Sequence, residues 1–114
     1  MRLSIVIPCF NEVGTIDAVL EAVRGVALPV EREIVVVDDF SKDGTRERLA
    51  ALEKTEHDLR VIYQPENRGK GAALRAGFAA ATGDIILIQD ADLECDPEDY
   101  PKLLAPILED KASV

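Results

Sequence analysis

Residues 33–39 read Glu-Ile-Val-Val-Val-Asp-Asp, and this run says more about the fold than any other. Its four central residues are all β-branched and apolar, so neither face of the segment is polar. Runs of this kind are typical of strands in parallel sheets that helices cover on both faces. We therefore predict a buried strand over residues 33–39 that ends in the carboxylates of Asp38 and Asp39.

Similar apolar runs lie on both sides of this segment, separated by stretches with helical periodicity. We expect the four strands at residues 4–8, 33–39, 61–64 and 84–90. We expect the helices at residues 16–25, from 45 through 52, at 71–82 and at about 97–109. This alternation predicts a single α/β domain over residues 1–114, Rossmann-like, with four parallel strands in the order 3-2-1-4 and helices on both faces.

Particular residues mark the expected helix ends. Gly25 stops the first helix, Thr45 caps the second, and Gly83 ends the third in the place that glycine often takes at a helix C-terminus. Asp96 followed by Pro97 predicts the start of the last helix. The glycines and alanines between residues 69 and 83 should let the third helix pack close to the sheet.

Composition narrows the class of protein. The chain has 114 residues, 47% hydrophobic and 31% charged, as in an ordinary globular domain. Its net charge of −9 disfavours binding to nucleic acid, which requires clustered Lys and Arg. We recognise no signal peptide and no apolar run near the roughly 20 residues of a transmembrane helix, so we expect a cytoplasmic protein. Cys9 and Cys95 are expected to be reduced, and a single His excludes a zinc site on ligand count.

Polar residues follow the first, second and fourth strands, at 11–12, 38–39 and 90–92. Ligands of parallel α/β sheets bind at this carboxyl edge. Asp90 and Asp92 point to the same side if the segment stays extended. A divalent cation, Mg²⁺ or Mn²⁺, fits between such carboxylates, and a solvated acidic turn is the competing interpretation.

Two further loops carry weaker signals. Asp43-Gly44 is expected to be a turn before Thr45. Residues 67–71 are basic and precede a helix, so they are candidates to contact a phosphate, with a solvated loop as the alternative. The spacing is not that of a P-loop, and no dinucleotide fingerprint follows the first strand.

Three blocks of the sequence together resemble the family 2 glycosyltransferases of GT-A fold. They are Ser-Ile-Val-Ile-Pro-Cys-Phe-Asn-Glu (4–12), Glu-Ile-Val-Val-Val-Asp-Asp-Phe-Ser-Lys-Asp-Gly-Thr (33–45) and Gln-Asp-Ala-Asp-Leu-Glu (89–94). With Asn-Arg-Gly-Lys-Gly-Ala-Ala-Leu-Arg-Ala-Gly-Phe over residues 67–78, the last block is most similar to the dolichyl- or polyprenyl-phosphate sugar transferase branch. The resemblance implies that the chain is the nucleotide-sugar-binding half of a GT-A domain.

The resemblance also implies roles for residues at the strand ends. The nucleotide pocket would be lined by Pro8, Phe10, Glu12, Val37 and Asp39. The diphosphate and the cation would be held by Asp90, Ala91 and Asp92. Glu94 would be a third metal ligand, at a position where this branch often carries Gln. Phe10 stands where Tyr is common, and Phe40 stands where the family usually has a small residue, which raises the question of whether Phe40 crowds the pocket.

The implied activity is that of an inverting, metal-dependent glycosyltransferase. It would move a sugar from a GDP- or UDP-sugar to an acceptor, expected to be a polyprenyl or dolichyl phosphate, at the cytoplasmic face of the membrane. Members of the family are longer than 114 residues and normally carry the acceptor side in the further part. We therefore expect a truncated domain that is inactive alone, and no catalytic base can be assigned.

Alternative interpretations stay open. The chain could be a binding module without turnover, or it could belong to a transferase that acts on a saccharide hydroxyl. A receiver domain would need a phosphoacceptor Asp after the third strand, where this chain has Gln64-Pro65. A nucleotidyltransferase would need a glycine-rich loop after the first strand, where residues 8–11 are Pro-Cys-Phe-Asn.

Overall fold

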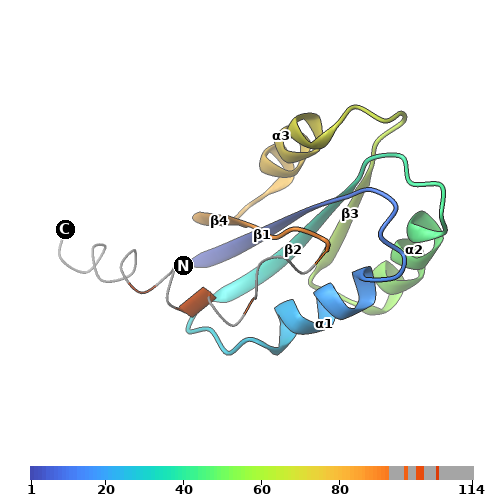
Figure 1. Cartoon of the computed structure of the whole chain (residues 1–114). Helices are drawn as coiled ribbons and strands as arrows, with labels where there is room; N and C mark the ends of the chain where they lie inside the picture. Colours follow the sequence, from blue (N-terminus) through green and yellow to red (C-terminus); the bar gives the residue numbers. More distant parts are fainter. Residues whose placement is uncertain (93–96, 98–99, 102–104, 106–114) are drawn as a thin grey trace.

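The computed structural model describes residues 1–92, 97, 100–101 and 105, and these form an α/β fold (Figure 1). Its strands are β1 (Arg2–Cys9), β2 (Glu31–Asp38), β3 (Leu59–Tyr63) and β4 (Ile85–Ile88). Its helices are α1 (Ile16–Gly25), α2 (Thr45–Thr55) and α3 (Lys70–Ala80). Most of the helix predicted over about 97–109 lies outside the described residues, and so do Asp96 and Glu94.

The four strands make one parallel sheet in the order β3-β2-β1-β4, which confirms the predicted topology. β1 pairs with β2 over its whole length, from Arg2 opposite Glu31 to Cys9 opposite Asp38. On its other side, β1 pairs with the whole of β4. Because all four strands run in the same direction, their carboxyl ends meet at one edge of the sheet.

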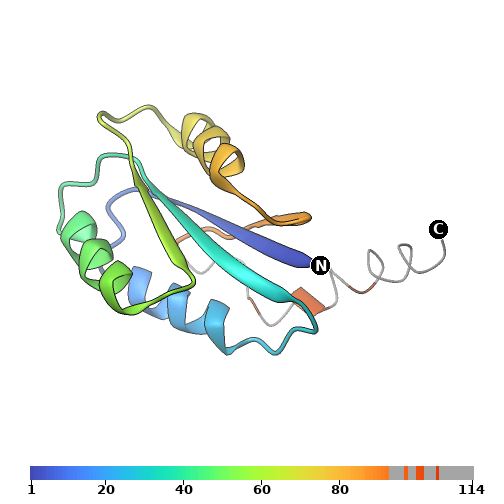
Figure 2. The ribbon, with the colours of Figure 1, turned by 180° about the vertical axis from the view of Figure 1, so that it is seen from behind.

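Helices cover both faces of the sheet, as predicted. In Figures 1 and 2, α1 and α2 lie on one face and α3 lies on the other. Ile5 and Ile7 of β1 belong to the apolar cluster that contains Leu20 of α1, whereas Val6 packs in a second cluster with Ala73 of α3. Alternate residues of β1 point to opposite faces of the sheet, and both faces are covered by helices, so apolar residues are needed on both.

The third helix packs unusually close to the sheet at Gly77. A β-carbon at this position would collide with the side chain of Val6 and would lie 3.3 Å from Cγ2 of Val37. Both valines are fully buried, so neither can move aside easily. The prediction that small residues serve close packing is confirmed here.

The start of α2 differs from the prediction. Thr45 is the first residue of the helix, and the residue before it, Gly44, has a left-handed backbone with a φ of 102°. Gly44 is thus the N-cap residue, and the carboxylate of Asp43, one residue earlier, accepts the backbone N–H of Thr45 at 3.0 Å. The Thr45 hydroxyl accepts the backbone N–H of Glu12 at 3.1 Å and thereby joins α2 to the loop that follows β1.

Gly83 also has a different role from the predicted one. α3 ends at Ala80, and Gly83 lies beyond it, against the first residues of β1. A β-carbon at residue 83 would lie 2.8 Å from the carbonyl oxygen of Arg2 and 2.6 Å from Oγ of Ser4. Glycine is therefore needed because two backbones approach each other, and a helix-ending conformation is not the reason.

Candidate functional site

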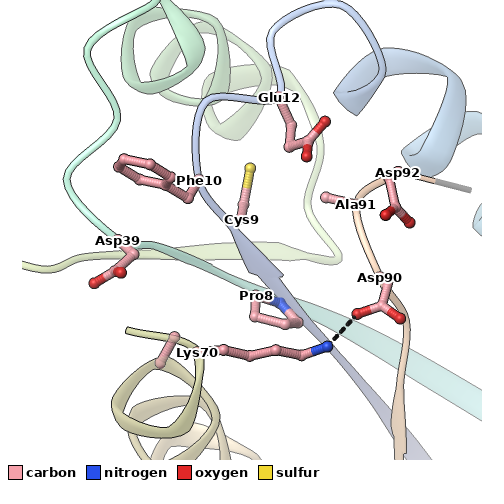
Figure 3. A pocket seen from close by; sticks show the side chains of 10 residues that line it. Pro8, Cys9, Phe10, Glu12, Asp39, Lys70, Asp90, Ala91 and Asp92 are labelled. Carbon is pink, nitrogen blue, oxygen red and sulfur yellow. Dashed lines mark hydrogen bonds and ion pairs between the residues drawn. The ribbon is translucent and has the colours of Figure 1, made fainter. Parts of the chain in front are cut away.

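A pocket opens at the carboxyl edge of the sheet (Figure 3). It is lined by Pro8, Cys9, Phe10, Glu12, Asp39, Lys70, Ala73, Asp90, Ala91 and Asp92. These residues come from the end of β1 and the loop after it, from the residue after β2, from α3, and from the segment after β4. Seven of the predicted site residues thus come together, and the place is the edge where parallel sheets bind ligands.

Two predicted residues are not part of this lining as described. Val37 is fully buried in the core, where it packs under α3. Glu94 lies outside the described residues. The structure adds three lining residues that were not assigned to the site from the sequence, namely Cys9, Ala73 and Lys70. Of these three, only Lys70 could have been found from the sequence, because it belongs to the basic run at residues 67–71.

The segment that carries Asp90 and Asp92 is anchored on two sides. The backbone N–H of Gln89 donates to the carbonyl of Val6 at 3.0 Å, which extends the pairing of β4 with β1 by one residue. The Thr15 hydroxyl donates to the carbonyl of Ala91 at 2.6 Å and ties the segment to the start of α1. Residues 91–92 form a turn, so the extended course expected from the sequence ends at Asp90, although both carboxylates line the pocket.

Lys70 reaches across the pocket to this segment. Its ammonium donates to Oδ1 of Asp90 at 2.7 Å, as Figure 3 shows. Lys70 is the first residue of α3, on the opposite wall from Asp90. The pocket lining thus holds one ammonium among four carboxylates, those of Glu12, Asp39, Asp90 and Asp92.

Asp39 holds the loop that leads into α3. Its two carboxylate oxygens accept the backbone N–H groups of Arg68 at 2.8 Å and Gly69 at 2.9 Å. The Asp39 residue is only 5% exposed, and Gly69 has a φ of 91°, which glycine adopts without strain. Asp39 therefore fixes the backbone immediately before Lys70. Each carboxylate oxygen has a second lone pair that remains available to a ligand.

The loops after β1 and β2 are tied to each other beside the pocket. The backbone N–H of Asn11 donates to Oγ of Ser41 at 2.8 Å, and the Asn11 side chain accepts the N–H of Lys42 at 2.8 Å. Asn11 has a left-handed backbone with a φ of 52°, a conformation that Asn tolerates better than most residues. Glu12 and Phe10, on either side of Asn11, are thereby held at the rim.

Phe40 does not line the pocket, which answers the question that its size raised. Its ring lies 5.3 Å from the Arg46 guanidinium and 5.4 Å from the Lys42 ammonium. The Phe40 backbone is left-handed, with a φ of 66°. This conformation is costly for a bulky residue, and it explains physically why a small residue suits the position.

Cys9 lies in the pocket but is not a nucleophile. Burial, together with the negative charges of Asp38, Glu12 and Asp43, raises the pKa of its thiol to about 12. The thiol is therefore protonated at neutral pH, and a protonated thiol neither attacks a sugar nor binds a metal.

The donor set suits a hard divalent cation that shares its shell with a ligand. Asp90 and Asp92 offer carboxylate oxygens at the same rim, which Mg²⁺ and Mn²⁺ accept. Within the described part of the chain, no group of three His, Cys, Asp or Glu residues could hold a metal alone. Such a cation would complete its coordination with phosphate oxygens and water, as Mg²⁺ commonly does.

Similar proteins of known family identify the family of this chain. The family model described as glycosyl transferase family 2 matches residues 4–114. The chain therefore belongs to glycosyl transferase family 2. Among similar solved structures is a mannosyltransferase from Pyrobaculum calidifontis in complex with GDP-Man and Mn²⁺, with a TM-score of 0.77 and 33% identity over 91% of this chain and 32% of that one.

Two similar proteins have names that describe sugar transferases of lipid phosphates. The chain is 35% identical to a dolichol-phosphate mannosyltransferase of Pyrococcus furiosus, over 94% of this chain and 30% of the relative. It is 37% identical to an undecaprenyl-phosphate 4-deoxy-4-formamido-L-arabinose transferase of Pseudomonas aeruginosa, over 90% of this chain and 31% of the relative. The chain thus spans about a third of the length of these relatives. Among the described residues, none of the helices combines the length and the hydropathy that a membrane span requires.

Proposed function

We propose that this chain is the donor-binding part of an inverting glycosyltransferase that transfers a sugar from a nucleoside diphosphate sugar to a polyprenyl or dolichyl phosphate. The observation that carries the proposal is the convergence of Asp90, Asp92 and Lys70 on one pocket at the carboxyl edge of the sheet. This arrangement offers both a cation site and a cationic group to a diphosphate. The names of the two lipid-phosphate transferases support the acceptor class.

Different residues at the rim of the pocket would bind different parts of the donor. Phe10 is 45% exposed and offers an apolar ring to a nucleobase or ribose. Asp39 and Glu12 offer acceptors to ligand hydroxyl or N–H groups, and Asp39 does so from a rigid, buried position. Asp90 and Asp92 would hold a divalent cation against the diphosphate, and such a cation would neutralise the charge that grows on the leaving group.

The acceptor class decides whether a general base is needed. A lipid phosphate is already anionic and needs little help to attack the sugar, whereas a hydroxyl acceptor would need a general base. Within the described pocket the only thiol, that of Cys9, is protonated at neutral pH. Attack by the phosphate on the face opposite the leaving diphosphate would invert the sugar configuration.

The pocket is small for the whole reaction. Its volume is about 160 Å³, whereas small-molecule sites usually measure roughly 300–1,000 Å³. We therefore expect this chain to bind the nucleotide part of the donor and to transfer sugar slowly or not at all. This is the reason for keeping a nucleotide-binding fragment without turnover as the second candidate.

A binding assay and a transfer assay test the proposal together. Calorimetry with GDP and with UDP, each with Mn²⁺, should detect binding of at least one nucleotide, and Asp39→Ala should weaken it by about 1–3 kcal/mol. Because Asp39 also holds residues 68–69, amide exchange should check that the loop stays ordered in the variant. Binding of neither nucleotide would contradict the proposal.

The transfer assay should offer polyprenyl phosphate and a saccharide acceptor in parallel. Any product should form on the polyprenyl phosphate. Product formed only on the saccharide would contradict the acceptor class, and rapid transfer by this chain would contradict the expectation drawn from the small pocket.

A further inference from the structure

We propose that Lys70 exchanges partners at this site: its ammonium occupies Asp90 in the empty protein and moves to the diphosphate when metal and nucleotide bind. The inference rests on the proposed function and deepens it. It assigns to Lys70 a role in the order of binding, because the lysine competes with the divalent cation for one carboxylate.

The geometry places the two cations on the same ligand. The Lys70 ammonium lies 2.7 Å from Oδ1 of Asp90, within the range of a strong charge-assisted hydrogen bond. A divalent cation bound by Asp90 and Asp92 would use the same carboxylate. A cation on the Asp90 carboxylate would lie close to the Lys70 ammonium, and the two positive charges would repel each other, so metal binding weakens or opens the Lys70–Asp90 pair.

The exposure of the Lys70 side chain allows it to change partners. It is 61% exposed, so its movement disturbs no core packing, and a lysine stem offers several rotamers. Its backbone, by contrast, is fixed, because Asp39 holds the two preceding residues through Arg68 and Gly69. The ammonium can therefore change its position in the pocket while the backbone of Lys70 stays in place.

A diphosphate gives the displaced ammonium a new partner inside the same pocket. A phosphate oxygen accepts a charge-assisted hydrogen bond from lysine as readily as a carboxylate does. Metal alone must therefore displace Lys70 without compensation, whereas metal and nucleotide together give Lys70 a second anion. This difference makes the empty site a poor binder of free metal and couples the two ligands.

The decisive variant is Lys70→Met, which keeps the helix-forming stem and removes the charge. The matched control is Lys54→Met, because Lys54 is an exposed lysine near the C-terminal end of α2, away from the pocket. Both variants lower the net charge equally, so any general electrostatic effect on Mn²⁺ binding cancels. Thermal melts of both should confirm that the fold is kept.

Electron paramagnetic resonance of free Mn²⁺ and calorimetry with nucleoside diphosphate give the two readouts. Relative to Lys54→Met, Lys70→Met should bind Mn²⁺ alone about two- to fivefold more tightly, the range expected when an exposed ion pair no longer competes. The same variant should bind the nucleoside diphosphate in the presence of Mn²⁺ at least about tenfold more weakly, because it loses a charged hydrogen bond.

Opposite signs for the two ligands are the signature of partner exchange. Unchanged or weaker binding of Mn²⁺ alone by Lys70→Met would overturn the inference, and so would unchanged nucleotide affinity. If the unsubstituted chain binds no nucleotide with or without Mn²⁺, the proposed function fails. If it binds nucleotide normally and Lys70→Met behaves like Lys54→Met, only the role of Lys70 fails.

Discussion

The contact between α3 and the sheet predicts opposite outcomes for the same substitution at two glycines. Gly77→Ala places a methyl group against the buried Val6 and Val37. Gly71→Ala, in the same helix, places the methyl group in ordinary van der Waals contact with Nη1 of Arg75, at 3.7 Å, and causes no clash. Both substitutions gain about 0.5–1 kcal/mol of helix stability, because alanine loses less backbone entropy than glycine.

Only Gly77→Ala also suffers the cost of overpacking, which is about 1–3 kcal/mol in a well-packed core. We therefore expect Gly71→Ala to raise the free energy of unfolding by about 0.5–1 kcal/mol. Gly77→Ala should lower it by about 1–2 kcal/mol, since the clash exceeds the gain in propensity. The difference between the two variants removes the propensity term and measures the clash itself.

Urea unfolding followed by far-ultraviolet circular dichroism suits this comparison, because the chain contains no Trp. A shift of α3 away from the sheet would also move Lys70, so Gly77→Ala should weaken nucleotide binding while Gly71→Ala should not. Equal stability of the two variants would refute the close approach of α3 to β1 and β2.

Three further predictions follow from other parts of the chain. Phe40→Gly should be about 1 kcal/mol more stable than Phe40→Ala in urea unfolding, because both lose the ring but only glycine relieves the left-handed backbone; equal stability would contradict strain there. Burial alone would raise the pKa of the Glu33 carboxyl, but hydrogen bonds from Ser4 and Thr82 and the charge of Arg2 bring it below its usual 4.5. The ionised Glu33 carboxylate therefore stabilises the fold above about pH 4.5, and this stability is lost as the pH falls through the lower pKa of the folded state. Glu33→Gln should therefore lose less stability in acid than the unsubstituted chain. Iodoacetamide should label Cys9 at pH 8 far more slowly in the folded than in the urea-unfolded chain, as peptide mapping would show, and equal rates would contradict its raised pKa.

The strand order could be predicted because it depends on short-range pattern and on general rules. The apolar run of β2 has no polar face, and right-handed crossovers leave few ways to arrange four parallel strands. Once the strands share a direction, Asp39 and Asp90 must lie at one edge of the sheet. The pocket at that edge therefore follows from the sequence without any knowledge of side-chain contacts.

The errors arise where a contact joins segments that are distant in the sequence. Gly83 looks like a helix terminator, but the backbone of β1, about 80 residues earlier, is what requires glycine there. Thr45 looks like a helix cap, but its hydroxyl accepts a hydrogen bond from the loop after β1, and the first N–H of the helix is bound by Asp43. The ion pair between Lys70 and Asp90 likewise depends on the position of α3 relative to β4, and no local sequence pattern encodes that position.

The measurement that bears most directly on the function is nucleotide affinity with Mn²⁺ and with a chelator, in the unsubstituted chain and in Asp92→Asn. Glu47→Gln, on the exposed face of α2, is the control for the loss of one negative charge. If Asp90 and Asp92 share a cation with the diphosphate, Mn²⁺ should tighten nucleotide binding at least about fivefold in the unsubstituted chain and in Glu47→Gln, and this gain should vanish in Asp92→Asn. Equal affinity with Mn²⁺ and with chelator in the unsubstituted chain would mean that the acidic edge is only a solvated turn and holds no metal.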